Sequence, residues 1–115
     1  MKQIPLKFLK GTASLYHVVS VDRYNKPTYG TGIDLSRIYC EPTNTTVRNS
    51  EGELQTDVLI LFFDCVNSLP SGTVFQKNDK LVKDGITYKV RTVDVLTNPM
   101  TNKVHHYEVR LLGND

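Results

Sequence analysis

The sequence DVLILFFDCV, residues 57–66, contains six consecutive apolar residues, from Val58 to Phe63. A strand with one solvated face alternates apolar and polar residues, whereas an unbroken apolar run is typical of a strand covered on both faces. A helix that spans a membrane needs about 20 apolar residues, so this run is far too short. We therefore expect this segment to be the central strand of the fold.

The residues downstream continue the pattern of strands. Leu81–Lys83 and Ile86–Val90 flank Asp84-Gly85, a strong signal for a two-residue hairpin turn. Beyond Val90 the apolar residues change face, which predicts a bulge or bend near Arg91-Thr92. Such bends help a small sheet close into a barrel. A last strand runs through residues 105–111.

Upstream of the central run, two further strands and a short N-terminal element are expected. Ile33–Glu41 reads as a strand, and Pro42 either ends it or places it at a sheet edge. Thr12–Asp22 alternates as one strand, followed by a loop over residues 23–32. Ile4–Lys10 fits either one helical turn or an extended arm.

With a short extended piece at Val74–Gln76, the chain has six or seven mostly antiparallel strands. Their spacing predicts an all-β fold, a small closed or partly open β-barrel with one long polar loop or hairpin arm. A chain of 115 residues has the usual length of one domain. We expect a single domain over residues 1–115, with residues 1–11 as an N-terminal arm.

The long polar segment is Thr43–Thr56, which is almost free of apolar residues. It carries a turn signal at Asn49–Gly52, and its many threonines favour an extended backbone. A flexible loop and a protruding two-stranded arm are both consistent with this composition. Either form leads directly into the apolar central strand.

Composition excludes several classes of protein. Lysine and arginine total 14 against 12 acidic residues, and a net charge of +2 gives no argument for nucleic-acid binding. The first residues lead into no apolar segment typical of a secretory signal, and no stretch has the length of a membrane helix. Cys40 and Cys65 are expected to be reduced, buried thiols of strands rather than a disulfide or a metal pair.

The strongest candidates for chemistry are the histidines. In a strand, His106 and Glu108 lie on the same face roughly 7 Å apart, but zinc needs a third and usually a fourth ligand. His17, Cys40 and Cys65 offer no such ligand at a local spacing. We expect His106, Glu108 and Arg110 to form an outer polar row and His105 to lie at the rim of the core face. The alternating pattern predicts His17 to be a hydrogen-bonded core histidine.

No nucleophile elbow and no phosphate-binding glycine motif is present. We therefore expect no enzyme, no cofactor and no metal. Two alternatives remain open. One is a nucleic-acid-binding barrel that stacks bases on tyrosine rings. The other is a metal-dependent enzyme that uses His105, His106 and Glu108.

A family resemblance is carried by residues along most of the chain. Its most distinctive part is the C-terminal segment His105-His106-Tyr107-Glu108-Val109-Arg110-Leu111. Looser matches are Ile4-Pro5, Tyr29-Gly30, Ile33–Tyr39, Phe62-Phe63-Asp64, Ser68, Asp79, Gly85, Tyr88, Val90 and Val93. On these residues the chain resembles the minor capsid, or head-completion, proteins of long-tailed phages and prophages of Gram-positive bacteria.

The resemblance implies a structural protein of the head–tail connector, found in the virion and in the bacterial host cytoplasm during assembly. Such proteins form a homo-oligomeric ring below the portal, close the DNA channel and provide the tail attachment site. The implied partners are the portal or an adaptor protein, the tail proteins and, in passing, the packaged DNA, without any membrane. The resemblance also allows a protein that is monomeric in isolation and is organised into a ring by the portal surface. The alternative within the same virion is a tail-side neck or tail-terminator component.

In related stopper proteins a long loop from each subunit reaches into the channel. From position and composition we infer that the counterpart here is the polar segment 43–56, the long polar excursion between buried strands. Its proposed channel residues are Thr45, Thr46, Val47, Arg48, Asn49, Ser50, Glu51, Gly52 and Glu53.

Overall fold

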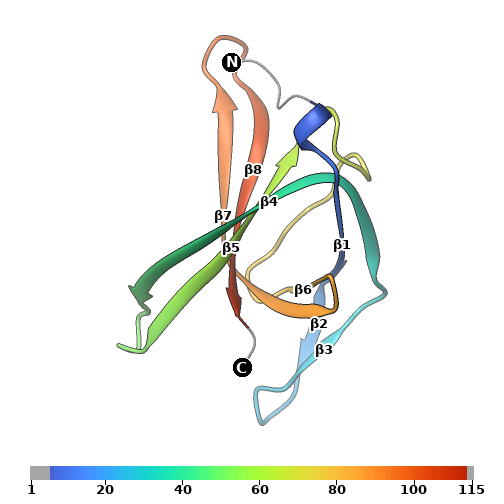
Figure 1. Cartoon of the computed structure of the whole chain (residues 1–115). Coiled ribbons are helices and arrows are strands. Elements are labelled where there is room, and N and C mark those ends of the chain that lie inside the picture. Colours follow the sequence, from blue (N-terminus) through green and yellow to red (C-terminus); the bar gives the residue numbers. More distant parts are fainter. Residues whose placement is uncertain (1–5, 114–115) are drawn as a thin grey trace.

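The computed structural model describes residues 6–113, which form a closed β-barrel with one short 3-10 turn and a small additional sheet (Figure 1). The elements are η1 (Leu6–Phe8), β1 (Gly11–Tyr16), β2 (Val18–Val21), β3 (Pro27–Tyr29), β4 (Ile33–Arg48), β5 (Leu54–Asp64), β6 (Lys80–Lys83), β7 (Ile86–Asn98) and β8 (Lys103–Gly113). Six strands close the barrel in the order β1-β4-β5-β8-β7-β6, and all neighbours are antiparallel. The predicted all-β barrel is confirmed, although the described residues contain eight strands rather than six or seven.

Strand β5 holds the centre of the barrel, as its apolar run predicts. It pairs with β4 on one side and with β8 on the other. Leu61 and Phe63 are buried completely or almost so, and Phe62 on the opposite face packs against Tyr39, with ring centroids 5.6 Å apart. The buried core that surrounds them consists of Ala13, Leu15, Leu35, Ile38, Phe75, Leu81, Val90, Val109 and Leu111.

Two local predictions downstream of the core are confirmed. Asp84 and Gly85 both have positive φ, 52° and 79°, as a tight turn between β6 and β7 requires. The register of β7 against β8 shifts between Val90 and Thr92, where the change of apolar face predicts a bulge. Because a bulge bends the strand and increases its twist, it helps β7 to close the barrel against β6.

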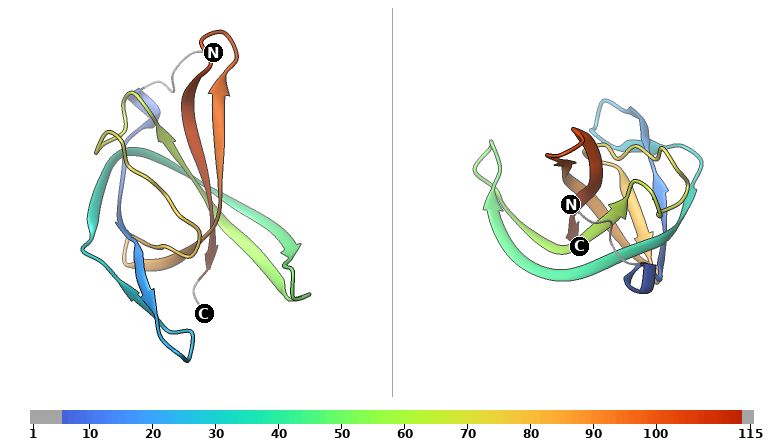
Figure 2. Two further views of the ribbon diagram at one scale, coloured as in Figure 1. Left: turned by 180° about the vertical axis from the view of Figure 1, so that it is seen from behind. Right: turned by 90° about the horizontal axis from the view of Figure 1, so that it is seen from above.

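Two hairpins project beyond the barrel in different directions (Figures 1 and 2). One is the β7–β8 hairpin. The other is the outer part of the β4–β5 hairpin, residues 43–56, which we call the arm. Strand β4 continues through Pro42 and pairs again with β5 from Thr45 to Arg48. Strand β1 pairs with β4 only as far as Ile38, so Pro42 lies at an open edge of the sheet. Proline has no backbone N–H, and at this edge no neighbouring strand needs one as a hydrogen-bond donor.

The predicted single strand Thr12–Asp22 is wrong. The chain instead forms β1 and β2, which are interrupted at His17, and β2 pairs only with β3 outside the barrel. Ala13 and Leu15 are buried as expected, but Val19 and Val21 are 63% and 56% exposed. The break arises because the carboxylate of Asp79 binds the His17 ring and the backbone N–H of Val18, so the strand leaves the barrel ladder.

Three smaller predictions need correction or qualification. Residues 23–32 are not wholly a loop, since Pro27–Tyr29 form β3. Residues 74–76 form no strand, although Phe75 is buried in the core. Of the expected N-terminal arm, residues 1–5 lie outside the described residues, Leu6–Phe8 adopt the helical-turn alternative and Leu9 is buried.

The central place of β5 can be tested by truncating one side chain. Replacing the fully buried Leu61 by alanine is expected to lower the free energy of unfolding by about 2–5 kcal/mol, because it removes apolar contacts and leaves a cavity. Leu54→Ala on the same strand is the matched control, since Leu54 is 65% exposed and its loss should cost less than about 0.5 kcal/mol. Urea denaturation followed by circular dichroism measures both, and equal losses would contradict the assignment.

Candidate functional site

The arm is an ordered two-stranded hairpin, so the hairpin alternative describes the polar segment and the flexible-loop alternative does not. Its tip is organised by Asn49, whose side-chain oxygen accepts hydrogen bonds from the backbone N–H groups of Glu51 and Glu53, at 3.0 and 2.9 Å. The N–H of Asn49 donates to the carbonyl of Glu53 at 2.8 Å. Gly52 has a φ of +85°, which a residue with a side chain adopts only with strain.

The two strands of the arm are also joined through side chains. The hydroxyls of Thr46 and Thr56 lie 3.1 Å apart across the hairpin, and the guanidinium of Arg48 donates to the carbonyl of Gly52 at 2.6 Å. Most side chains between residues 43 and 54 are exposed. The arm is therefore a preformed polar projection whose shape is set by its own hydrogen bonds.

A buried ion pair anchors the base of the arm to the barrel. Asp57, the residue just before the apolar run, is fully buried, and both of its oxygens accept hydrogen bonds from Arg91. The Arg91 Nε and Nη2 atoms lie 2.6 and 2.7 Å from these oxygens. This hydrogen bonding raises the pKa of Arg91, so its guanidinium stays charged. Sequence reasoning missed this pair because the two residues are far apart in the chain; the available signal was a carboxylate next to an apolar run.

Bulges on either side of β8 bring this pair together. The β5–β8 register shifts between Asp57 and Leu59, and the β7–β8 register shifts between Val90 and Thr92. Asp57 and Arg91 stand at these two irregularities and reach each other across the intervening strand. The direction in which the arm leaves the barrel is therefore coupled to the bend of β7.

A groove runs between the arm and the barrel. The arm contributes Asn49, Ser50 and Glu51, and the opposite wall carries Lys77 and Lys89. Further wall residues come from the β2–β3 hairpin, namely Val18, Val21, Pro27 and Tyr29. The barrel side of the groove is thus basic, while the arm tip carries a carboxylate.

His105, His106 and Glu108 on β8 are linked in a linear series of hydrogen bonds. The Nδ1 atoms of His105 and His106 lie 2.6 Å apart, and Nε2 of His106 lies 3.0 Å from a carboxylate oxygen of Glu108. These contacts are satisfied when His105 donates to Nδ1 of His106 and His106 donates from Nε2 to Glu108. A register shift between β7 and β8 at this point allows two consecutive imidazoles to meet.

The predicted outer polar row is wrong for His106, which is only 8% exposed because His105 and the Phe62 ring pack against it. Glu108 and Arg110 remain partly exposed, and Arg110 binds Asp94 at 3.2 Å. Both ring nitrogens of His106 are engaged in hydrogen bonds. Within residues 6–113, no group of three or more His, Cys, Asp or Glu side chains is placed to hold a metal ion.

The remaining members of the C-terminal motif support the fold. Val109 and Leu111 are fully buried in the core, and Tyr107 packs beside Phe63 and Phe75. The motif that carries the resemblance is thus largely the core-facing part of β8 and one buried histidine chain. It is remote from the arm tip in sequence.

His17 and the cysteines also have structural surroundings. His17 is hydrogen-bonded as predicted, with Nδ1 2.6 Å from Asp79, but its side chain is 30% exposed and so it is not a core residue. Cys40 lies in β4 and Cys65 just beyond β5, and both are free, partly buried thiols. Burial raises the pKa of Cys40 to about 11 and also raises that of Cys65, which makes both poor nucleophiles near neutral pH.

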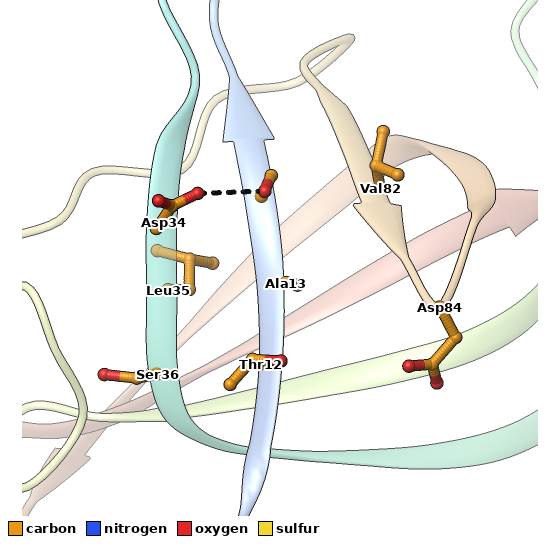
Figure 3. Close-up of a pocket in the computed structure, with 8 residues that line it drawn as sticks. Thr12, Ala13, Asp34, Leu35, Ser36, Val82 and Asp84 are labelled. Atoms are coloured by element: carbon orange, nitrogen blue, oxygen red, sulfur yellow. Dashed lines mark hydrogen bonds between the residues drawn. The ribbon is translucent and has the colours of Figure 1, made fainter.

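A shallow hollow lies on the outer surface where β1 runs between β4 and β6 (Figure 3). The hydroxyl of Ser14 donates to Asp34 at 3.1 Å, and Asp84 stands near Val82 at another part of the rim. The ionisable side chains that line this hollow are Asp34 and Asp84, and no histidine, lysine or cysteine lines it.

A search of the helices among the described residues found none that is long and apolar enough to cross a membrane.

Comparison with known proteins gives a family match and a structural similarity. A family model described as minor capsid protein matches residues 5–111 of this chain. A search of curated proteins found no match. Among solved structures, the chain is similar to the phage-like element PBSX protein xkdH from Bacillus subtilis, with a TM-score of 0.50 and 16% sequence identity. The similarity covers 90% of this chain and 93% of the other, and at this identity it shows a common fold.

The buried ion pair at the base of the arm can be tested with Arg91→Met. Methionine keeps much of the apolar stem but leaves Asp57 buried without a partner, so we expect a loss of about 3–5 kcal/mol in the free energy of unfolding. Arg110→Met is the matched control, because the partly exposed Arg110–Asp94 pair should contribute about 1 kcal/mol or less. Urea denaturation compares the two variants. A similar small loss in both would show that the Asp57–Arg91 pair does not anchor the structure.

Proposed function

The chain belongs to the minor capsid protein family, and on that premise we propose that it is a head–tail connector component of a long-tailed phage. Membership of the family gives it a structural role in a phage particle. In the proposed role, copies made in the host cytoplasm dock as a ring below the portal after DNA packaging. The ring closes the DNA channel and presents the surface to which the tail attaches. The portal or an adaptor protein contacts one side and tail proteins contact the other.

The observation that carries this proposal is the arm. It is a polar hairpin that projects from a closed barrel, with a tip held by Asn49 and a base held by the buried Asp57–Arg91 pair. A projection that must obstruct a channel has to hold its direction, and both features restrict its movement. The proposed channel residues Thr45–Glu53 lie in the outer half of this hairpin.

The charge of the arm suits passing contact with DNA. Between Thr43 and Leu54 it carries one basic residue, Arg48, and two acidic residues, Glu51 and Glu53. Tight binding to phosphates depends on neutralisation by several lysines or arginines, which this surface lacks. Such an arm obstructs DNA sterically without holding it electrostatically. The two lysines of the groove lie behind the tip on the barrel wall.

The nucleic-acid-binding alternative receives less support from the structure. A single-strand-binding barrel gathers exposed aromatic rings on one face so that successive bases can stack. Of the six tyrosines, only Tyr24 and Tyr39 are exposed, by 69% and 39%, and they belong to different elements, the β2–β3 turn and β4. The Tyr39 ring is already packed against Phe62. A tail-side neck or terminator component remains the second candidate within the same structural class.

Shortening the arm tests the proposed gate. Residues 47–55 are replaced by Asn-Gly, so that a two-residue turn joins Thr46 directly to its partner Thr56. Asp57 and Arg91 are retained, and the barrel should therefore fold as before. We expect phage particles that carry this variant to assemble but to lose packaged DNA, so that the fraction of filled heads falls severalfold. Electron microscopy and measurement of nuclease-protected DNA provide the readout.

The matched control keeps the full arm but neutralises its tip with Glu51→Gln and Glu53→Gln. Because obstruction is steric, this control should retain DNA as the unmodified protein does. If the shortened variant gave DNA-filled, infectious particles, the proposal that the arm closes the DNA channel would be rejected. Deleting the whole gene separates the broader alternatives: free heads and free complete tails support a connector, whereas joined particles contradict it.

A further inference from the structure

We propose that copies of this chain join edge to edge, with β7 of one copy adding to β4 of the next. That this pairing closes a ring of copies rests on the connector function proposed above. The pairing itself is argued from unpaired strand edges in this structure. The segments concerned are Thr92–Asn98 on β7 and Thr43–Arg48 on β4, which is the outer strand of the arm.

Both segments lie where the outer parts of β4 and β7 extend past the strands that close the barrel, β1 and β6. On one side, β1 pairs with β4 only from Ile33 to Ile38. On the other, β6 pairs with β7 only as far as Lys89, and Val90 then bonds to residues 78 and 79. Beyond these points, no strand among the described residues covers either edge. An uncovered edge presents a row of free N–H and C=O groups to a further strand.

The backbone direction on β7 follows from two observed bonds. Val90 donates to Asp79 and accepts from Asn78, so its N–H and C=O point away from β8. His105 accepts from Cys65, which shows that odd-numbered residues of β8 bond towards β5. Tyr107 and Val109 therefore do not bond to their β7 partners, Val95 and Val93. The N–H and C=O groups of Val93 and Val95 consequently point out of the open edge.

This edge lacks the usual protection against pairing. Natural edge strands are blunted by lysine, proline or a covering loop. The segment Thr92–Asn98 contains no lysine or proline, is rich in residues that favour strands, and exposes 55% of Val95. On β4, by contrast, Pro42 lacks an N–H and blocks continuous pairing at that point. A partner strand is therefore directed to the arm beyond Pro42.

A second copy fits these edges better than an unrelated strand does, for two reasons. First, the charges are complementary: Asp94 is the one charged residue of Thr92–Asn98, and Arg48 is the one charged residue of Thr43–Arg48. Asp94, which also binds Arg110 of its own copy, is half exposed, and Arg48, which donates to the carbonyl of Gly52, is exposed. Second, successive strands of the sheet alternate in direction, so β7 and β4 are antiparallel to each other. A neighbouring β4 placed beside β7 continues the same antiparallel order.

The two edges are different surfaces, and within one copy the hairpins that carry them project in different directions (Figures 1 and 2). Pairing of one with the other is therefore heterologous, which generates a ring when the rotation closes. It also gives the arm a second anchor, because each β4 would be held by the β7 of a neighbour. The tip, Asn49–Glu53, lies beyond the paired segment and stays free.

Cysteine cross-linking in phage particles tests the pairing. Thr45→Cys is combined in turn with a cysteine at position 94, 95, 96 or 97, and the particles are oxidised and run on a non-reducing gel. Side chains alternate between the two faces of a strand, so cross-linked multimers should appear strongly at alternate positions only. The Thr45→Cys single variant controls for the native thiols, of which Cys40 has a pKa of about 11 and reacts slowly. No multimers at any position, or equal yields at all four, would overturn the proposal.

A backbone variant gives an independent test. Val95→Pro removes one outward N–H without removing a bond to β8, whereas Val95→Thr keeps that N–H and serves as the control. We expect Val95→Pro to remain folded by circular dichroism and to reduce joined particles about tenfold relative to Val95→Thr. Equal assembly of the two variants would contradict edge pairing.

Immunogold labelling of the same particles separates this inference from the proposed function. Label at the tail-proximal vertex without cross-linked multimers rejects edge pairing and leaves the connector role in place. Cross-linked multimers in particles labelled elsewhere support edge pairing and reject the connector role.

Discussion

The ion pair between Asp57 and Arg91 is the constraint on which the arrangement of barrel and arm depends. Burying a charged carboxylate costs desolvation free energy, and the guanidinium of Arg91 offsets that cost with two short hydrogen bonds to Asp57. The pair reaches across β8 and sits where the registers of β5 and β7 both shift. It thereby fixes the bend that closes the barrel and the point at which the arm departs. The packing of Leu61, Val109 and Leu111 fills the space that this geometry defines.

Local signals predicted the parts of the fold that depend on neighbouring residues. The apolar run after Asp57 identified the central strand, Asp84-Gly85 identified a turn, and the change of apolar face near Arg91 identified a bulge. The failures arose from contacts between distant segments. Alternation continued through His17, yet Asp79, far along the chain, draws that residue and Val18 out of the barrel. The polar arm could be located from composition, but its hairpin form depends on Asn49 and its anchor on a partner that no local pattern reveals.

The polar groups that looked most reactive in the sequence are used to stabilise this fold. The side chains of His105, His106 and Glu108 are linked by successive hydrogen bonds. At the break between β1 and β2, the carboxylate of Asp79 binds the His17 ring and the backbone N–H of Val18. Buried polar groups held in this way help to specify one arrangement of the surrounding strands. Exposed apolar side chains are found instead on the hairpins, among them Val95, Met100, Leu54 and Val19. The surfaces available for contact are therefore projections from the barrel rather than a cleft within it.

The closure of the barrel by β1 against β6 has a consequence for the newly made chain. These strands are far apart in the sequence, so their pairing is a highly non-local contact that is formed against a large loop-closure entropy. The N-terminal strand must remain without its second partner until the ribosome has synthesised β6. Folding is accordingly expected to be slow for a domain of this size, on the order of milliseconds to seconds. During that interval the nascent chain exposes strand edges, and rapid synthesis at high concentration favours aggregation over folding.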